Sequence, residues 1–329
     1  MIRFRFHLKH ITTTVIFFVL FTGCGKEEIN TILPPPPVAN FVYEDFTDHA
    51  SLRSTSTGEI SEYLWYASDD YQTLLKPRRN NADLNLPSVA TKVTVSLTVK
   101  NSGGSSTYTE IIDLPALTFC RKYGLGKNVE VEHSNNVDYE WYIDQFDTGE
   151  YGYFNCGPSC VTMALKWANQ NFSKTTEEAR YTLPILQPLP GWLWEFHEIY
   201  LSDNQAIWEK KEFRKANDLK NQIDNGNILI IALRYSRIRE EIKSDWRIDR
   251  FHPIPWGSIV DHYMIIKGYK IVDDILWFEA YDPASSGMRN IGDGSLKGRD
   301  RYYRDDDIIE AAFGHSQFPV MIVIYKEII

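Results

Sequence analysis

Apolar and polar side chains alternate over several short stretches in the first third of the chain. Residues 93–99 show this most clearly, because threonine or serine separates their four valine and leucine positions. A period of two predicts a half-buried strand, and Ser102-Gly103-Gly104 just after it is typical of a hairpin turn. Further runs of this kind cover residues 39–43, 62–66 and 107–112. We therefore expect an all-β domain over residues 38–115.

A different pattern, with apolar residues three and four positions apart, begins near residue 158. One face of a helix over residues 158–168 would carry Val161, Ala164, Leu165 and Ala168. A more polar helical pattern covers residues 206–224. Runs typical of strands follow at residues 228–233, 262–271, 275–281 and 320–325. A helix before a set of antiparallel strands predicts an α+β domain over residues 116–329.

The N-terminal segment has the pattern of an export signal followed by a spacer. Arg3, Arg5 and Lys9 precede an apolar run over residues 11–21. That run is too short to cross a bilayer as a helix, but it suits a signal peptide. Four consecutive prolines at residues 34–37 favour a stiff, extended chain. We expect residues 1–23 to be a signal peptide and residues 24–37 a tether.

The end of the apolar run, Phe21-Thr22-Gly23-Cys24, resembles the lipobox of bacterial lipoproteins. The resemblance implies cleavage before Cys24 and a lipid on its thiol, which would make the membrane a partner. Lys26-Glu27-Glu28 resembles the surface-export tag of some outer-membrane lipoproteins. These features imply a lipid-anchored protein of the bacterial cell envelope, at the outer membrane or cell surface. The alternative is an ordinary signal peptide or an anchor helix with a chance cysteine.

Length, charge and cysteine count narrow the classes of function. The 329 residues, 43% of them apolar, have room for about two folded domains. A formal net charge of −9 is the opposite of a basic footprint, so no nucleic-acid partner is expected. If Cys24 carries lipid, Cys120, Cys156 and Cys160 remain, and three thiols cannot all pair. A free thiol in an oxidising compartment needs an explanation, and catalysis is one.

The candidate nucleophile is Cys156, in the run Asn155-Cys156-Gly157-Pro158. Pro158 has no N–H group and fits the first turn of a helix, so Cys156 is expected at a helix N-terminus. Unpaired N–H groups and the helix dipole favour a thiolate there. The alternative is a small buried cysteine that caps the helix. Cys160, one turn later, is expected to pack in the core, and a disulfide to Cys120 stays open.

A histidine and an aspartate stand at the open end of a predicted hairpin. Facing residues in an antiparallel pair have numbers of constant sum, so a turn centred on Val272 would pair His262 with Asp282. A slip of one residue would put the two on opposite faces. Pro283 ends the second strand. The carboxylate would set the tautomer of the imidazole and stabilise its charged form.

Residues 130–329 resemble the exported papain-like cysteine peptidases of the bacteriocin-leader peptidase (C39-like) type. Those domains carry Cys-Gly-Pro at a helix start, a His that opens a strand, and an Asp or Asn at the end of the next strand. The resemblance implies a helix packed on an antiparallel sheet, with a peptide or protein as substrate. It implies Cys156 as nucleophile, His262 as general base and Asp282 as the residue that orients the histidine.

Three residues upstream of the triad positions bear on this resemblance. The family's oxyanion-binding glutamine is matched best by Gln145, whereas Glu150, at a closer spacing, would repel an oxyanion. Asp261 stands where the family commonly has glycine, and its carboxylate could compete for the histidine.

The sequence shows no His-Glu-x-x-His and no paired-cysteine motif, so no metal or cofactor is expected. Trp192, Trp194 and Phe196 are expected to pack in the core or to line a substrate cleft.

The β domain resembles the polycystic-kidney-disease type of immunoglobulin-like β-sandwich. The matching runs are Ala39-Asn40-Phe41, Tyr63-Leu64-Trp65-Tyr66 and residues 95–101. The family's Gly-Asp-Gly turn is replaced by Ala67-Ser68-Asp69-Asp70. The resemblance implies a spacer or adhesion module.

Two alternatives to a peptidase stay open for the whole chain: an inactive domain that binds peptide or glycan, and an acyl transferase that uses the same triad.

Overall fold

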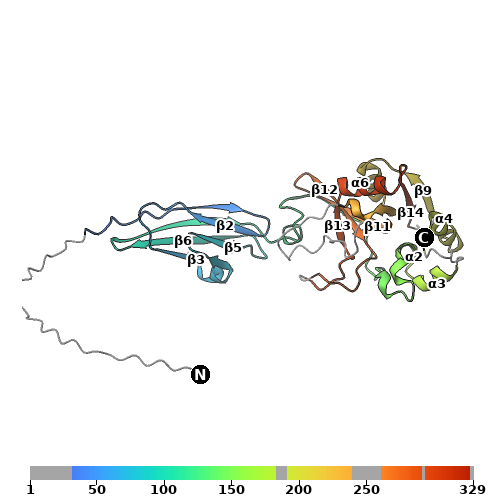
Figure 1. Cartoon of the computed structure of the whole chain (residues 1–329), viewed down its shortest axis with the longest axis horizontal. Coiled ribbons are helices and arrows are strands. Elements are labelled where there is room, and N and C mark those ends of the chain that lie inside the picture. Colours follow the sequence, from blue (N-terminus) through green and yellow to red (C-terminus); the bar gives the residue numbers. More distant parts are fainter. Residues whose placement is uncertain (1–31, 183–190, 239–260, 291–292, 327–329) are drawn as a thin grey trace, which may run out of the picture.

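The computed structural model describes residues 32–182, 191–238, 261–290 and 293–326. Figure 1 shows one part built mainly of strands and a mixed part in which the labelled α-helices lie. Cys24 and the predicted signal peptide lie outside the described residues, so the lipid anchor stays a prediction. Within the described ranges, no helix has the length and apolarity needed to cross a membrane.

The all-β part consists of two antiparallel sheets, ordered β1-β2-β5-β4 and β3-β6-β7. The strands are β1 (Phe41–Asp45), β2 (His49–Ser54), β3 (Glu62–Ala67), β4 (Leu75–Pro77), β5 (Asn81–Asn85), β6 (Thr91–Asn101) and β7 (Gly104–Leu114), with the 3-10 helix η1 (Asp69–Leu74) before β4. Leu52 and Leu84 from the first sheet meet Trp65 and Leu97 from the second in one apolar core. The two sheets therefore pack face to face around this core, in the manner of a β-sandwich.

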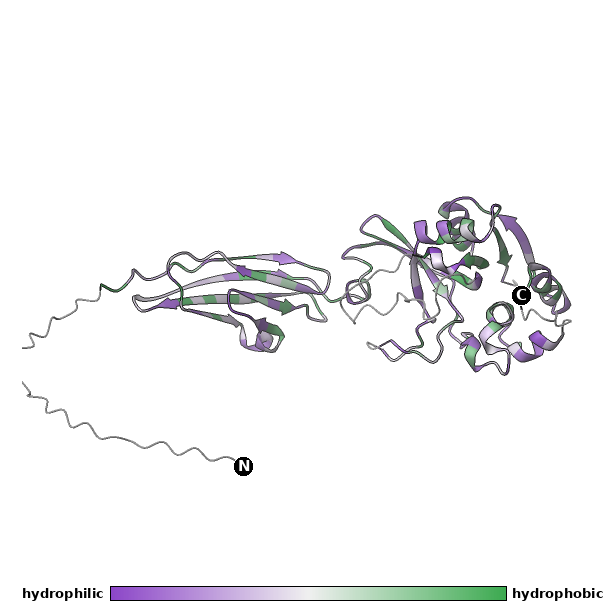
Figure 2. Ribbon diagram, viewed as in Figure 1, coloured by the Kyte–Doolittle hydropathy of each residue, from purple (hydrophilic) through white to green (hydrophobic). Residues whose placement is uncertain are grey.

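The alternating pattern of the sequence is visible in this sandwich. Apolar and polar residues follow one another along its strands in Figure 2, and every second residue of β6 from Val93 to Val99 is buried. Asn101 pairs with Gly104, which confirms the predicted hairpin turn. The proline run lies against this turn, because Asn101 Nδ2 donates to Pro35 O at 2.8 Å. The polycystic-kidney-disease type of this sandwich stays a prediction.

The C-terminal part is built on a seven-stranded antiparallel sheet. Its order is β13-β12-β11-β10-β14-β9, with β8 beside the far half of β11. The strands are β8 (Val129–Ser134), β9 (Trp208–Glu212), β10 (Ile228–Arg234), β11 (Asp261–Val272), β12 (Ile275–Tyr281), β13 (Arg301–Arg304) and β14 (Val320–Ile324). The helices are α1 (Phe119–Lys122), α2 (Cys156–Ala168), α3 (Thr176–Thr182), α4 (Trp194–Asp203), α5 (Ala216–Asp224) and α6 (Asp305–His315), with the 3-10 turns η2 (Gln145–Asp147), η3 (Gly152–Phe154) and η4 (Tyr235–Arg237).

Each face of this sheet has its own apolar core. Along β10, Ile228 and Ile230 pack with α2 and α4, whereas Leu229 and Ile231 pack with α5 and α6. The period of two along the strand therefore separates two helical layers. The mixed helix-and-sheet composition that the sequence predicts is confirmed, and so are the predicted helix at α2 and the strands β10, β11, β12 and β14.

The predicted helix over residues 206–224 is wrong in its first half. Residues Trp208–Glu212 form β9, an edge strand that pairs with β14, and only Ala216–Asp224 is helical. The strand reads Trp-Glu-Lys-Lys-Glu, and its charged residues give no clear apolar period. Charged residues are common on edge strands, where they discourage pairing with another chain. Its structure is thus fixed by pairing with β14 rather than by local pattern.

The predicted register of the β11–β12 hairpin is also wrong. Asp273 and Asp274 form the turn, and Val272 pairs with Ile275. The register then shifts at Lys267, an extra residue on β11, so that Ile266 faces Ala280 and Ile265 faces Tyr281. Continued in this register, Asp282 lies opposite Met264 and not His262. The shift of two residues keeps His262 and Asp282 on one face.

The segment before β8 joins the two parts of the chain. Cys120, Tyr123 and Leu125 pack against Val272 and Trp277 of the C-terminal sheet. Arg121 reaches the other way, with Nη1 3.1 Å from Asp45 Oδ1 and Nη2 3.2 Å from Asp45 Oδ2. The Arg121 side chain is buried. Its paired contact with Asp45 connects the sandwich to the mixed domain.

Candidate active site

Cys156 is the first residue of α2, where the sequence places it. Pro158 lies in the first turn, and the buried residues of the helix include Val161, Ala164 and Leu165. The side chain of Asn155, just before the helix, does not cap it, because Nδ2 donates to Thr148 and Oδ1 accepts from Arg180. The N–H group of Gly157 contacts the sulfur of Cys156 instead. The start of the helix therefore supports a thiolate.

His262 brings the second functional group to this thiol. It lies near the start of β11, its side chain is buried, and it is hydrogen bonded to Cys156. Its Nε2 lies 2.8 Å from Asp282 Oδ1. Since Nε2 faces the carboxylate, Nδ1 is the ring nitrogen left to face the sulfur. The structure thus brings Cys156, His262 and Asp282 together in the predicted order.

The charges in this chain of groups shift the pKa values toward an ion pair. Burial raises the pKa of the Cys156 thiol. Hydrogen bonds from His262, Tyr263 N–H and Gly157 N–H outweigh burial and bring this pKa below its usual value. Burial lowers the pKa of His262, but the charge of Asp282 and the bond to it outweigh burial and raise this pKa to about 9. A thiolate beside an imidazolium is the reactive form of a cysteine nucleophile.

Asp282 is completely buried and is bonded at both oxygens. Oδ1 accepts from the Ala284 N–H at 2.8 Å in addition to its contact with His262. Oδ2 accepts from Tyr235 Oη at 2.8 Å, from Tyr303 Oη at 2.6 Å, and from Arg301 Nη1. Burial raises the pKa of Asp282, but the charges of Arg301 and His262 lower it well below its usual range.

The residues around Oδ2 were not predicted from the sequence. Arg301 and Tyr303 are two residues apart on β13 and so share one face, but the run Arg-Tyr-Tyr-Arg carries no period-two signal that would have identified them. Tyr235 follows β10 and sits in η4. These residues come from two segments that lie more than sixty positions apart.

Gln145 lies in η2, close to the start of α2, and its side chain is buried. Its Nε2 donates to Gly152 O and Tyr153 O, both at 3.1 Å, while Oε1 is buried and finds no partner among the described residues. Both amide hydrogens therefore bind backbone carbonyls. An oxyanion would have to replace one of these carbonyls to bind the Gln145 amide.

The two other carboxylates near the motif do not compete for His262. Asp261 Oδ1 lies 3.3 Å from Arg234 Nε and 3.3 Å from His315 Nδ1. Its side chain is half exposed, on the opposite side of the strand from the neighbouring His262. Glu150 is exposed in the turn before η3. Asp282 is thus the carboxylate that the structure pairs with the histidine.

Trp192 closes the other side of the helix start. The indole lies directly on Gly157, where an added Cβ would come within 2.2 Å of Trp192 Cδ1. Arg180 Nη2 donates to Phe154 O at 2.7 Å, and its guanidinium lies 5.4 Å from the Trp192 ring. Trp192 is buried in the core, and Trp194 and Phe196 are partly buried against the same core. The glycine of the Cys-Gly-Pro motif is therefore required by packing.

The remaining described cysteines lie in other surroundings. Cys120, Cys156 and Cys160 are all free thiols. Cys160 is fully buried, and burial raises the pKa of its thiol well above the usual value. Burial also raises the pKa of the Cys120 thiol. Among these three cysteines, the thiol pKa is thus lowered at Cys156 and raised at Cys120 and Cys160.

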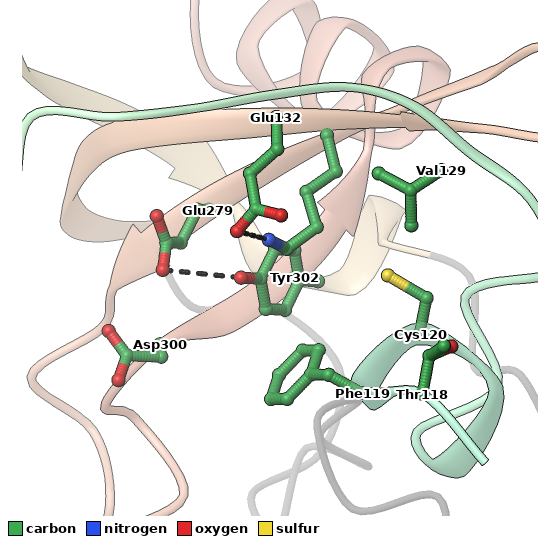
Figure 3. A pocket seen from close by; sticks show the side chains of 9 residues that line it. Thr118, Phe119, Cys120, Val129, Glu132, Glu279, Asp300 and Tyr302 are labelled. Carbon is green, nitrogen blue, oxygen red and sulfur yellow. Dashed lines mark hydrogen bonds and ion pairs between the residues drawn. The ribbon is translucent and has the colours of Figure 1, made fainter. Parts of the chain in front are cut away.

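Cys120 lines a hollow of about 510 Å³ near the far end of β11. Figure 3 shows the carboxylates of Glu132 and Glu279 in contact with other side chains that line it. Glu132 binds Lys270, and Glu279 Oε1 lies 3.2 Å from Tyr302 Oη. Lys270 and His262 are eight residues apart on one strand, about 26 Å at the usual rise. This hollow is therefore separate from the triad.

No cluster of three or more His, Cys, Asp or Glu side chains suited to a metal ion occurs in the described ranges.

No protein-family profile matches the chain, and no curated protein matches it. Among solved structures, the chain is similar to one from Bacillus anthracis that is described as a C39-like peptidase. The two are 13% identical, with a TM-score of 0.37, and the match covers 60% of this chain and 99% of the other. A likeness at this TM-score does not identify a family, so the function is inferred from the side chains of the site.

Proposed function

We propose that this protein is an exported, lipid-anchored cysteine peptidase of the papain-like, C39-like type. One observation carries the proposal: the Cys156 thiol, at a helix start, is hydrogen bonded to His262, which lies 2.8 Å from the buried Asp282. Nucleophile, base and orienting acid in this sequence of contacts are the parts of a catalytic triad.

The proposed reaction is acyl transfer to water. The Cys156 thiolate attacks the carbonyl carbon of a peptide bond and forms a tetrahedral oxyanion. Collapse of this intermediate breaks the C–N bond, and the His262 imidazolium gives its proton to the leaving amine. A water molecule then gives a proton to the neutral imidazole and attacks the thioester, which releases the acid and regenerates the thiolate–imidazolium pair.

The oxyanion needs donors close to Cys156. The Cys156 backbone N–H is one proposed donor, since it belongs to the first helical residue. The Gln145 amide is the second. It holds Gly152 O and Tyr153 O in this structure, so its role requires one of these hydrogen bonds to be exchanged for the oxyanion. Gln145→Glu would remove the donor pair, and Gln145→Asn would keep it at a shorter reach.

The test of the activity is cleavage of a mixed peptide library by the purified protein, followed by mass spectrometry. Residues 32–329 should cut peptides, and Cys156→Ala should abolish the cleavage while it leaves the thermal unfolding curve in place. Cys160→Ala is the matched control, because Cys160 is a core residue one turn away. Cleavage by the Cys156→Ala protein would contradict the proposal, and so would a wild-type protein that cuts none of the peptides.

The anchor is proposed from the run that ends at Cys24, and the tether and β-sandwich would hold the peptidase away from the membrane. Cys24→Ala should move the protein from the membrane fraction to the soluble fraction of the cell. Unchanged fractionation would rule out the lipid anchor without affecting the proposed activity.

A further inference from the structure

The carboxylate of Asp282 is held from behind by a buried cation. Arg301 is fully buried, and its Nη1 contacts Asp282 Oδ2, Tyr235 Oη at 2.7 Å and Tyr303 Oη at 3.0 Å. Its Nε donates to Lys297 O at 3.0 Å. The two tyrosine hydroxyls therefore bridge the guanidinium and the carboxylate, and each donates its own proton to Oδ2.

This arrangement leaves only one side of Asp282 for the histidine. Oδ2 receives three donors, so Oδ1 is turned toward His262 Nε2 and the Ala284 N–H. Arg301 starts β13 and pairs with Ala280, two residues before Asp282, so the cation is held by the sheet itself. Rotation of the carboxylate would break contacts at both oxygens.

The charges alternate along the row from Arg301 through Asp282 and His262 to Cys156. During the proposed reaction His262 gives up its proton, and Asp282 then loses one of its two positive neighbours. A buried carboxylate without a positive neighbour favours its neutral form. Arg301 still faces Asp282 at that stage, so the carboxylate stays ionised and is ready to stabilise the imidazolium when the proton returns.

We propose that Arg301, with Tyr235 and Tyr303, is a positioning group that keeps Asp282 ionised and aimed at His262 throughout the catalytic cycle. The inference rests on the proposed function, because it assigns a role within the same site. Arg301 does not touch the thiol, so its effect reaches Cys156 through Asp282 and His262. The titratable groups that surround Asp282 are His262 on β11, Cys160 on α2, Tyr142 before η2, Tyr235 in η4, and Arg301 and Tyr303 on β13.

The test is the pH dependence of the rate of carbamidomethylation of Cys156 by iodoacetamide, measured by peptide mass mapping. Arg301→Met should move the acid limb of this rate upward by about 1 pH unit or more, since Asp282 then protonates at a higher pH. Arg301→Lys keeps the charge and should restore most of the wild-type limb. Arg299→Met is the matched control, because Arg299 is half-exposed and binds Glu140 on the surface.

A second set of variants covers the case in which Arg301→Met does not fold. Tyr303→Phe and Tyr235→Phe remove one donor each and no charge, so each should move the limb in the same direction by less. Wild-type-like limbs in the folded Arg301→Met protein, or in both tyrosine variants if Arg301→Met is unfolded, would overturn the inference and leave the peptidase proposal standing. Slow labelling of Cys156 in the wild type would contradict both this inference and the peptidase proposal.

Discussion

Asp282 contacts His262 diagonally across the β11–β12 hairpin, with 2.8 Å between Oδ1 and Nε2. In the register near the turn, Gly268 faces Glu279, and an unbroken continuation would place Asp282 opposite Ile265. The acid would then point away from the face that carries His262. The extra residue at Lys267 changes the register by one position and puts both side chains on one face. The bulge is thus part of how the site is built.

Loss of the Asp282 charge should destabilise the fold as well as the site. Asp282→Asn leaves the Arg301 guanidinium buried without its carboxylate, so the free energy of unfolding should fall by about 3–5 kcal/mol. Adding Arg301→Met removes the unpaired charge and should recover a large part of this loss. Urea denaturation of the single and double variants measures both effects. A double variant that loses the sum of the two single losses would contradict the paired role.

The glycine after the nucleophile should not tolerate a methyl group. Gly157→Ala places a Cβ within 2.2 Å of Trp192 Cδ1, so the indole must move away from the helix start. We expect a loss of about 1–3 kcal/mol in the free energy of unfolding and lower peptidase activity. Gly191→Ala is the control, because a Cβ at Gly191 meets no atom within 4 Å. Equal stability of the two variants would show that Trp192 does not need this contact.

The peptidase site should work without the β-sandwich. A chain of residues 116–329 keeps the segment that packs on Val272 and Trp277, but it loses the Asp45 partner of Arg121. We expect Cys156 labelling at the wild-type rate, because the deletion exposes Arg121 to water, where its charge needs no partner. A folded 116–329 chain with slow Cys156 labelling would show that the sandwich contributes to the site.

Activity should fall at alkaline pH as His262 loses its proton. Its pKa of about 9 in the folded protein lies above the ordinary value of 6.5, so the imidazolium and its bond to Asp282 are fully present below pH 6.5 and are lost as the pH rises through about 9. The same ion pair adds stability in that range. The rate of peptide cleavage should show an alkaline limb near pH 9. A limb near pH 6.5 would mean that Asp282 does not act on the imidazole.

The sequence predicted those parts of the site that follow from local pattern. Pro158 and the apolar stripe after it place Cys156 at a helix start, and alternation identifies β11 and β12 as strands. The register between the strands was not predictable, because a bulge at a charged residue such as Lys267 leaves no periodic signal. His262 and Asp282 kept a common face because the predicted register was off by an even number of residues.

Long-range contacts explain the other differences. Arg301 looks like an ordinary surface arginine until β13 is paired with β12 and the side chain is enclosed. The strand β9 forms because β14 supplies its hydrogen-bond partners. Four of its five residues are charged, so its own sequence shows no alternation of apolar and polar positions. Gln145 was found from a resemblance, and its contacts to Gly152 O and Tyr153 O are properties of a folded turn. These features depend on tertiary structure, which residue patterns do not encode locally.

The ionisation of Cys156 tests the triad most directly, through the rate of iodoacetamide labelling at mildly acidic pH. We expect Cys156 to react faster than an ordinary thiol of pKa about 8.5, while the buried Cys120 and Cys160 stay unlabelled. His262→Ala should remove most of this advantage, since the imidazolium partner of the thiolate is gone, and Asp282→Ala should remove less. Labelling of Cys156 no faster than that of a free cysteine, and unchanged by His262→Ala, would contradict a catalytic triad at this site.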